Sequence, residues 1–446
     1  MQAGSQAARP APAYGLTPFD CGFDARLDPA APAPIALGLS GGGDSLALLT
    51  LALDWARPYG RRVLALTVDH GLQDQSAAWT ARAGEQALSL GADWRGLAWT
   101  GPKPARGIAA AARRARHALL AEAARDAGAA VLLLGHTADD VAEGERMRSL
   151  GSTLGRLRDW APSPVWPEGR EIFLCRPLLD VRRAALRAHL EGLGLDWIDD
   201  PANADPRSLR ARVRAELALE LDRHPGSREA AIRDRHDEAA SPERSRLSAL
   251  RAPAGMTRAY RAAGLLAFPR DGFARSDLAV ALVCAAGRET PPRGAALERL
   301  AARLAGNDAF TATLAGARLE AGRETIHIFR EPGEAARGGL VPIRVEPGRP
   351  VVWDGRFEIT AREPGLIRAA SGLASRLDSG DRAALKLLPS AARGGVPVLI
   401  RDFDPRPVLA GGPARVRDLV ELRRLLACGL IAHEREITGL RVALAV

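Results

Sequence analysis

The residues with the clearest chemical use form one short segment, which reads Ser-Gly-Gly-Gly-Asp-Ser and follows an apolar run. Three glycines let the backbone curl so that its N–H groups face an anion, and a helix that begins there adds unpaired donors and the positive end of its dipole. Asp44 would repel a phosphate unless a cation lay between them, so the segment predicts a nucleoside triphosphate bound with Mg²⁺. The alternative is a glycine-rich turn in which Asp44 only starts a helix. The candidate nucleotide ligands here are Ser40, Gly41, Gly42, Gly43, Asp44 and Ser45.

Three acidic residues form a second candidate group after another apolar run. If a helix begins at Ala138, then Asp139, Asp140 and Glu143 lie on one side of its first turns. They could hold a metal ion or a cationic substrate, or they could only complement the helix dipole. His136, just before them, is either a ligand contact or a polar loop residue.

Asp69 and His70 follow a third apolar run. They could bind the nucleoside part of the ligand or accept a proton, and the alternative is a simple turn.

Two arginine pairs have helical spacing. Arg113 and Arg116 lie three residues apart and share a helix face, which predicts a phosphate contact or an exposed arginine-rich face. Arg210 and Arg214 lie four apart, which predicts either a contact with a nucleic-acid backbone or a solvated charged helix.

The elements that must position these residues alternate between short apolar runs and longer helical patterns. Strands are predicted at residues 35–39, 63–68, 94–99, 130–134 and 172–175. Helices are predicted at residues 44–56, 76–90, 108–127, from 138 onward, and at 181–192. This alternation predicts an α/β fold with a doubly wound, Rossmann-like parallel sheet, whose ligands sit at the carboxyl ends of the strands.

The domain boundaries follow changes in composition. Residues 1–33 are rich in Ala and Pro and predict a flexible leader, followed by the sheet domain at 34–221. Residues 225–332 predict a helical or mixed accessory domain, and residues 340–446 predict a C-terminal α+β accessory domain that is helical over 416–427.

Composition limits the function classes. The chain has 446 residues and a formal net charge of +9, which fits a polyanionic partner or an ordinary solvated arginine surface. Only Lys103 and Lys386 are lysines, and neither stands in a Walker phosphate loop. The four cysteines form no Cys-x-x-Cys pair, which fits a reducing compartment, and no run approaches the roughly 18 apolar residues of a membrane span. We therefore expect a cytoplasmic protein with no membrane contact.

The segment from Ser40 to Ser45 resembles the Ser-Gly-Gly-x-Asp-Ser motif of the PP-loop, or N-type, ATP pyrophosphatases. Within that superfamily, residues 35–220 resemble the tRNA(Ile)-lysidine synthase family. The other matching runs are Val68-Asp-His-Gly-Leu72, Ala-Arg-Arg-Ala-Arg-His117, Gly135-His-x-x-Asp-Asp-x-Ala-Glu143, Arg176-Pro-Leu-Leu179 and Asp200-Pro-x-Asn-x-Asp205. The chain departs from the family pattern at His117, Gly144 and Ala211.

The resemblance implies ligation of L-lysine to C2 of the wobble cytidine in the CAU anticodon of an isoleucine tRNA. It implies an adenylated cytidine intermediate, with ATP cleaved to AMP and pyrophosphate and with Mg²⁺ as the metal. The implied ATP-binding residues are the Ser40–Ser45 segment with Asp69, His70 and His136. The implied catalytic residues are Asp44, Asp139, Asp140 and Glu143, with Asp44 and Asp139 holding the metal. The implied substrate or tRNA contacts are Arg113, Arg116, Arg210 and Arg214.

Two alternatives stay open at this point. One is another PP-loop tRNA-modifying enzyme of the thiolase type, although thiolation in this superfamily commonly relies on paired cysteines. The other is a non-catalytic RNA-binding protein on the same scaffold. The sequence makes no prediction of oligomeric state.

Overall fold

A computed structural model describes residues 19, 21–152, 154–199, 205, 207–223, 261–270, 273, 275–427, 429 and 431–443. The first part of the predicted leader, most of the 200–205 motif and the stretch from 224 to 260 lie outside these residues. The chain divides into two compact units, Met1–Ser241 with Ala432–Thr438, and Pro242–Ile431 with Gly439–Val446.

The first unit is built on a six-stranded sheet with the order β3-β2-β1-β4-β6-β5. Its strands are β1 Ile35–Gly38, β2 Val63–Asp69, β3 Asp93–Ala98, β4 Val131–Leu134, β5 Trp160–Pro162 and β6 Phe173–Cys175. All neighbours pair in parallel except β5, which pairs antiparallel with β6. The strand order reverses between β1 and β4, and in open α/β sheets the crevice at such a reversal is where ligands bind.

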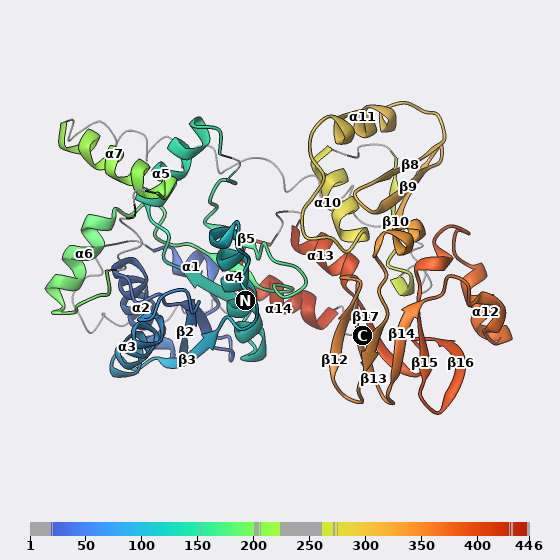
Figure 1. Cartoon of the computed structure of the whole chain (residues 1–446), viewed down its shortest axis with the longest axis horizontal. Coiled ribbons are helices and arrows are strands. Elements are labelled where there is room, and N and C mark those ends of the chain that lie inside the picture. Colours follow the sequence, from blue (N-terminus) through green and yellow to red (C-terminus); the bar gives the residue numbers. More distant parts are fainter. Residues whose placement is uncertain are drawn as a thin grey trace, which may run out of the picture. The chain divides into compact units, whose positions relative to one another are not determined.

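Seven helices are described in this unit. They are α1 Phe23–Arg26, α2 Gly43–Ala56, α3 Ser76–Ser89, α4 Ile108–Asp126, α5 Ala138–Ser149, α6 Arg183–Gly192 and α7 Leu209–Arg223. Helices α2 and α3 lie beside strands β2 and β3 (Figure 1). The predicted α/β fold with a doubly wound sheet is confirmed, and most predicted element ends lie within two residues of the observed ones.

Both faces of the sheet are covered, as the apolar strands predict. Ile35, Ala36 and Leu37 of β1 are each at most 1% exposed, and successive strand residues point to opposite faces. On one face Ala36 belongs to a buried cluster with Leu120 of α4 and Leu132 of β4.

Part of the predicted leader is folded. Helix α1 falls within residues 21–33, and Phe23 lies 6% exposed with its ring 5.9 Å from that of Trp55. Trp55 also donates a hydrogen bond to Asp24 at 2.7 Å. The prediction of flexibility is therefore wrong for this stretch, because its one aromatic side chain packs against a distant helix.

The second unit is mainly antiparallel. One sheet has the order β7-β10-β9-β8, with β7 Leu266–Pro269, β10 Thr325–Arg330, β9 Ala317–Ala321 and β8 Phe310–Leu314. Another has the order β11-β14-β15-β16, with β11 Ile343–Val345, β14 Gly365–Ala369, β15 Pro397–Arg401 and β16 Asp404–Leu409. The third joins β12 Pro350–Trp353, β13 Phe357–Ala361 and β17 Ala414–Asp418. The helices described in this unit are α10 Arg275–Ala285, α11 Ala295–Leu304, α12 Ser379–Lys386 and α13 Leu419–Ala427, and α14 Glu434–Ala443 has residues in both units.

Two details differ from the predicted accessory domains. Residues 416–418 belong to strand β17, which pairs with β13, and the predicted helix begins only at Leu419. In addition, one buried cluster contains Ala263 and Phe329 together with Ala370 and Val398. The predicted domains 225–332 and 340–446 thus share a core, so the described parts of both fall largely within one unit.

Candidate active site

The glycine-rich segment connects β1 to α2, and Ser45 fixes its shape. The Ser45 hydroxyl donates to the carbonyl of Gly42 at 2.9 Å and accepts from the N–H of Ser40 at 3.1 Å. Helix α2 begins at Gly43, and no side chain caps it. Its first N–H groups are therefore available to an anion, as the sequence predicted.

A short segment after α6 covers this loop. The N–H of Ile198 donates to the carbonyl of Gly41 at 2.9 Å. Gly41 has a φ of +82°, and a Cβ there would lie 2.7 Å from Cδ1 of Ile198. A Cβ on Gly43 would lie 3.4 Å from the Trp197 ring. Sequence reasoning did not identify Trp197 or Ile198, because nothing local connects them to a loop far away along the chain.

The predicted acidic group lies at the start of α5, next to the strand-order reversal. Thr137 and Asp140 form a capping box, in which the Asp140 carboxylate accepts from the N–H of Thr137 at 2.8 Å and Thr137 Oγ1 accepts from the N–H of Asp140. Glu143 is only 2% exposed. Asp140 therefore caps the start of α5, where its charge also complements the helix dipole as the alternative interpretation described.

Arg183, the first residue of α6, joins this group to the glycine-rich segment. Its Nε donates to Asp44 at 2.9 Å, and its other guanidinium nitrogens lie 3.7 Å from Asp140 and 3.4 Å from Glu143. Its backbone N–H donates to Asp139 at 2.8 Å. The structure thus brings all four predicted acids together around an arginine that sequence reasoning missed.

Arg210 and Arg214 lie on one face of α7, as their spacing predicted, but they contact acids. Arg210 donates to Glu143 and to Asp140, each at 2.7 Å, and Arg214 donates to Glu143 at 2.7 Å. In this structure their charges are therefore neutralised within the site.

Asp44 and Glu143 differ in their electrostatics. Burial raises the pKa of Asp44 above its ordinary value of 3.8, although the Arg183 guanidinium acts in the opposite direction. Burial would also raise the pKa of Glu143, but hydrogen bonds from Arg214 and Arg210 outweigh that effect and lower it below 4.5. Asp44 is therefore the more easily protonated of the two.

A basic group lies on α4 and at the ends of β4 and β6. Burial, together with repulsion by Arg113, lowers the pKa of Arg116 to about 10. Arg176 Nε donates to Nδ1 of His136 at 3.1 Å, and burial with the Arg176 charge keeps the pKa of His136 well below 6.5. Among the described residues, Arg113 and Arg116 form no ion pair. Such mutually repelling cations form a site that an anion would stabilise.

His117 is enclosed in the same region. It is 3% exposed, and neither of its ring nitrogens has a hydrogen-bond partner among the described residues. Burial and the charge of Arg116 lower its pKa to about 2, so the ring is neutral at physiological pH.

Asp69 and His70 occupy the end of β2. The Asp69 carboxylate accepts a side-chain hydrogen bond from Ser76, which lowers its pKa, and also accepts from the N–H of Gly71 at 2.7 Å. This is the turn that the alternative interpretation described. Burial lowers the pKa of His70 and nearby Arg116 adds to the effect, which places His70 close to the basic group.

The carboxylates suit Mg²⁺, which prefers oxygen ligands, but the described residues do not form a complete metal site by themselves. The described residues contain no cluster of three or more His, Cys, Asp or Glu side chains able to hold a metal ion. Proteins usually hold Mg²⁺ by one or two carboxylates plus substrate phosphates. Asp44, which belongs to the glycine-rich segment, fits a metal ion that arrives with a nucleotide.

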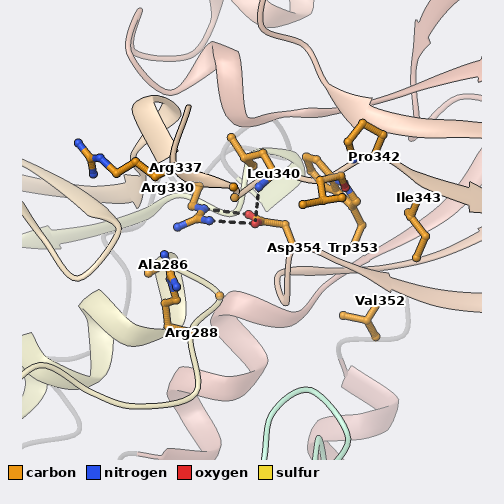
Figure 2. A pocket seen from close by; sticks show the side chains of 14 residues that line it. Ala286, Arg288, Arg330, Arg337, Leu340, Pro342, Ile343, Val352, Trp353 and Asp354 are labelled. Atoms are coloured by element: carbon orange, nitrogen blue, oxygen red, sulfur yellow. Dashed lines mark hydrogen bonds and ion pairs between the residues drawn. The ribbon is translucent and has the colours of Figure 1, made fainter. Parts of the chain in front are cut away.

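A depression in the second unit, with a volume of about 490 Å³, contains none of the predicted site residues in its lining. Figure 2 shows Arg330 and the N–H of Leu340 directed at the carboxylate of Asp354, at 3.0 and 3.3 Å. Arg288, also in the lining, donates to Glu334 at 2.6 Å. The first ion pair joins β10 to the turn after β12, and the second joins the segment after α10 to the segment after β10, which accounts for the charged lining.

Comparison with known proteins identifies the family. The chain is 49% identical over 422 residues to the tRNA(Ile)-lysidine synthase of Caulobacter vibrioides, and the match covers 92% of this chain and 97% of that protein. The chain belongs to the tRNA(Ile)-lysidine synthase family. The tRNA(Ile)-lysidine synthase of Hyphomonas neptunium is 39% identical over 72% of this chain and 91% of its own length.

The family model of the PP-loop domain matches residues 19–221 of this chain. The match begins ahead of β1 and so includes α1. Among solved structures, the U34-tRNA thiolase NcsA from Methanococcus maripaludis is 21% identical, over 45% of this chain and 71% of that one, with a TM-score of 0.37. Within the described residues, no helix has both the length and the apolar character needed to cross a membrane.

Proposed function

We propose that this protein ligates L-lysine to C2 of the wobble cytidine in the CAU anticodon of an isoleucine tRNA. The observation that carries the proposal is 49% identity to a tRNA(Ile)-lysidine synthase over 92% of this chain, combined with a PP-loop and four acids gathered at the reversal between β1 and β4. ATP and tRNA are its substrates with lysine, and the reaction belongs in the cytoplasm, where charged tRNA is used.

The proposed reaction has two steps. The C2 oxygen of cytidine first attacks the α-phosphorus of ATP, which forms adenylated cytidine and releases pyrophosphate. The ε-amine of lysine then attacks C2, AMP leaves with that oxygen, and the amine loses a proton. The first step turns a poor leaving group into a good one, and backbone donors aimed at the departing pyrophosphate stabilise its developing charge.

The described contacts support a division of roles. The uncapped start of α2 binds the pyrophosphate part of ATP, and Mg²⁺, held by Asp44, would neutralise phosphate charge when bound. The acids of α5 are the proposed contacts for an ammonium group of lysine. Arg113 and Arg116, which lack an acidic partner among described residues, are the proposed contacts for the tRNA phosphate nearest the target base.

A thiolase is the weaker alternative. Within the described part of the chain, burial raises the pKa of the Cys175 thiol to about 12, and a thiol that stays protonated is a poor nucleophile. The identity to lysidine synthases over almost the whole chain also favours lysine as the incoming group.

The proposal is tested by incubating the protein with ATP, Mg²⁺, radiolabelled lysine and an isoleucine tRNA transcript bearing CAU, with a methionine CAU tRNA as control. We expect label on the isoleucine tRNA only, with one AMP formed for each lysine attached. AMP formation without label would retain the ATP chemistry but reject lysine as the substrate. Neither product from a folded, RNA-binding protein would favour the non-catalytic alternative.

A further inference from the structure

One guanidinium lies where a substrate cation would be expected. Arg183 contacts Asp44 on one side and Asp140 and Glu143 on the other, at 2.9, 3.7 and 3.4 Å. A divalent metal ion or an ammonium group at this point would compete for the same carboxylate oxygens.

The charges of the site already balance. The carboxylates of Asp44, Asp139, Asp140 and Glu143 are paired with the guanidiniums of Arg182, Arg183, Arg210 and Arg214. Four negative and four positive charges leave no net attraction for a bare divalent cation. A cation can enter favourably only if an arginine withdraws or if an anion arrives with it.

Arg183 is the arginine best placed to withdraw. Its side chain is less exposed than those of Arg182, Arg210 and Arg214, but among the four it is the one that pairs with Asp44, whose side chain is 22% exposed. The backbone of Arg183 is fixed through its N–H bond to Asp139, so a change of partner needs only side-chain rotation. Asp44 lies in the first turn of α2, so phosphates bound at the glycine-rich segment would lie close to the same guanidinium.

We propose that Arg183 is a resident cation that neutralises the acids until nucleotide binds, and that it then moves from Asp44 to the ATP phosphates. Metal binding thereby depends on nucleotide. The planar guanidinium suits both partners, because it forms paired hydrogen bonds with carboxylates and with phosphates. Arg183 acts here as a positioning residue, and the inference rests on the proposed use of ATP.

The test measures Mn²⁺ binding by the paramagnetic resonance signal of free Mn²⁺, with the full chain and without tRNA or lysine. Wild-type protein should bind Mn²⁺ weakly alone and one ion per chain with α,β-methylene-ATP, which lacks the cleavable bond. Arg183→Gln should bind Mn²⁺ about tenfold or more tightly without nucleotide, because one positive charge is gone from the acids. The same variant should bind the nucleotide analogue about tenfold more weakly.

The matched control is Arg187→Gln, one turn further along α6, where the side chain pairs with Asp199 outside the acid group. It removes the same charge, which acts on Asp44 only at a distance, and should change nucleotide-free Mn²⁺ binding much less than Arg183→Gln does. Arg183→Lys keeps the charge without the planar fork, so Mn²⁺ binding should stay weak while nucleotide binding still falls.

Two results would overturn the inference. One is tight, stoichiometric Mn²⁺ binding by wild-type protein without nucleotide, which needs no variant and so does not depend on whether Arg183→Gln folds. The other is unchanged Mn²⁺ affinity in a folded Arg183→Gln protein. If wild-type protein fails to bind the nucleotide analogue at all, the proposed function fails as well, so the two failures are distinguishable.

Discussion

At the scale of single residues, the four acids share one site but not one environment. Asp44 is half shielded by Arg183 and has a raised pKa, while Glu143 is enclosed by arginines and has a lowered one. Asp44 pairs with one arginine among the described residues, Arg183, which suits a ligand that exchanges. Glu143 is buried and pairs with three arginines, Arg183, Arg210 and Arg214, which suits a structural anchor.

Asp44→Asn should lower AMP and pyrophosphate formation about a hundredfold or more, because the neutral side chain cannot hold Mg²⁺ beside the phosphates. Burial raises the pKa of Asp44 above 3.8. Wild-type activity should therefore also fall as the pH is lowered through this raised pKa, because Asp44 becomes protonated. Steady-state assays between pH 4.5 and 8 measure both effects. Asp54→Asn, at the other end of α2, is the control and should stay active.

Glu143→Gln should destabilise the first unit by about 2–3 kcal/mol at pH 7, because it leaves Arg214 without an acidic partner among the described residues and leaves Arg210 with Asp140 alone. The pKa of Glu143 is lowered on folding, so its contribution is present above pH 4.5 and is lost as the pH falls through the lower folded value. Urea unfolding at pH 7 and pH 3.5 should show a gap between the two proteins that closes in acid. An equal gap at both pH values would contradict this role.

At the scale of elements, the site depends on three junctions between a strand or loop and a helix. The segments after β1 and β4 end in helices α2 and α5, and the start of α6 brings Arg183 between them. The segment after α6 then returns to cover the glycine-rich segment through Ile198. The loop therefore has its shape because of its own glycines and because of a distant segment that packs on it.

Gly41→Ala tests this junction. The left-handed backbone alone should cost about 1 kcal/mol for an alanine, and the short approach to Ile198 should add to it and weaken ATP binding. Gly101→Ala is a matched control, since Gly101 has a φ of +91° but nothing within 4 Å of its added Cβ. Thermal unfolding and ATP titration compare the two, and equal effects would show that the contact with Ile198 is unimportant.

At the scale of the whole molecule, a segment near the C-terminus belongs to the first unit. Arg61 donates to Glu434 at 2.8 Å, and each of these side chains is 2% exposed. Glu434 also accepts from the N–H of Asp28 at 2.8 Å. Arg61 and Glu434, which are separated by most of the chain, therefore form one buried ion pair.

Glu434→Gln should lower the stability of the first unit by about 3 kcal/mol, because it leaves the Arg61 cation buried without its counter-charge. Differential scanning calorimetry of the full chain would detect this as an earlier transition of that unit. Arg435→Gln, which removes an exposed contact with Asp28, should leave the transition nearly unchanged. Equal shifts for the two variants would argue against the buried pair as an anchor.

The sequence by itself determined the elements of the first unit and the places where each candidate group begins. Those features depend on short-range information: apolar runs, helical spacing and a glycine-rich segment directly before a helix. What only the tertiary structure decided is which charges meet. Arg183 and Asp44 are 139 residues apart, and Arg210 and Asp140 are 70 apart, so no local pattern could pair them. Arg210 and Arg214 were predicted to face either nucleic acid or solvent, and in the structure they pair with acids because folding places α7 against α5.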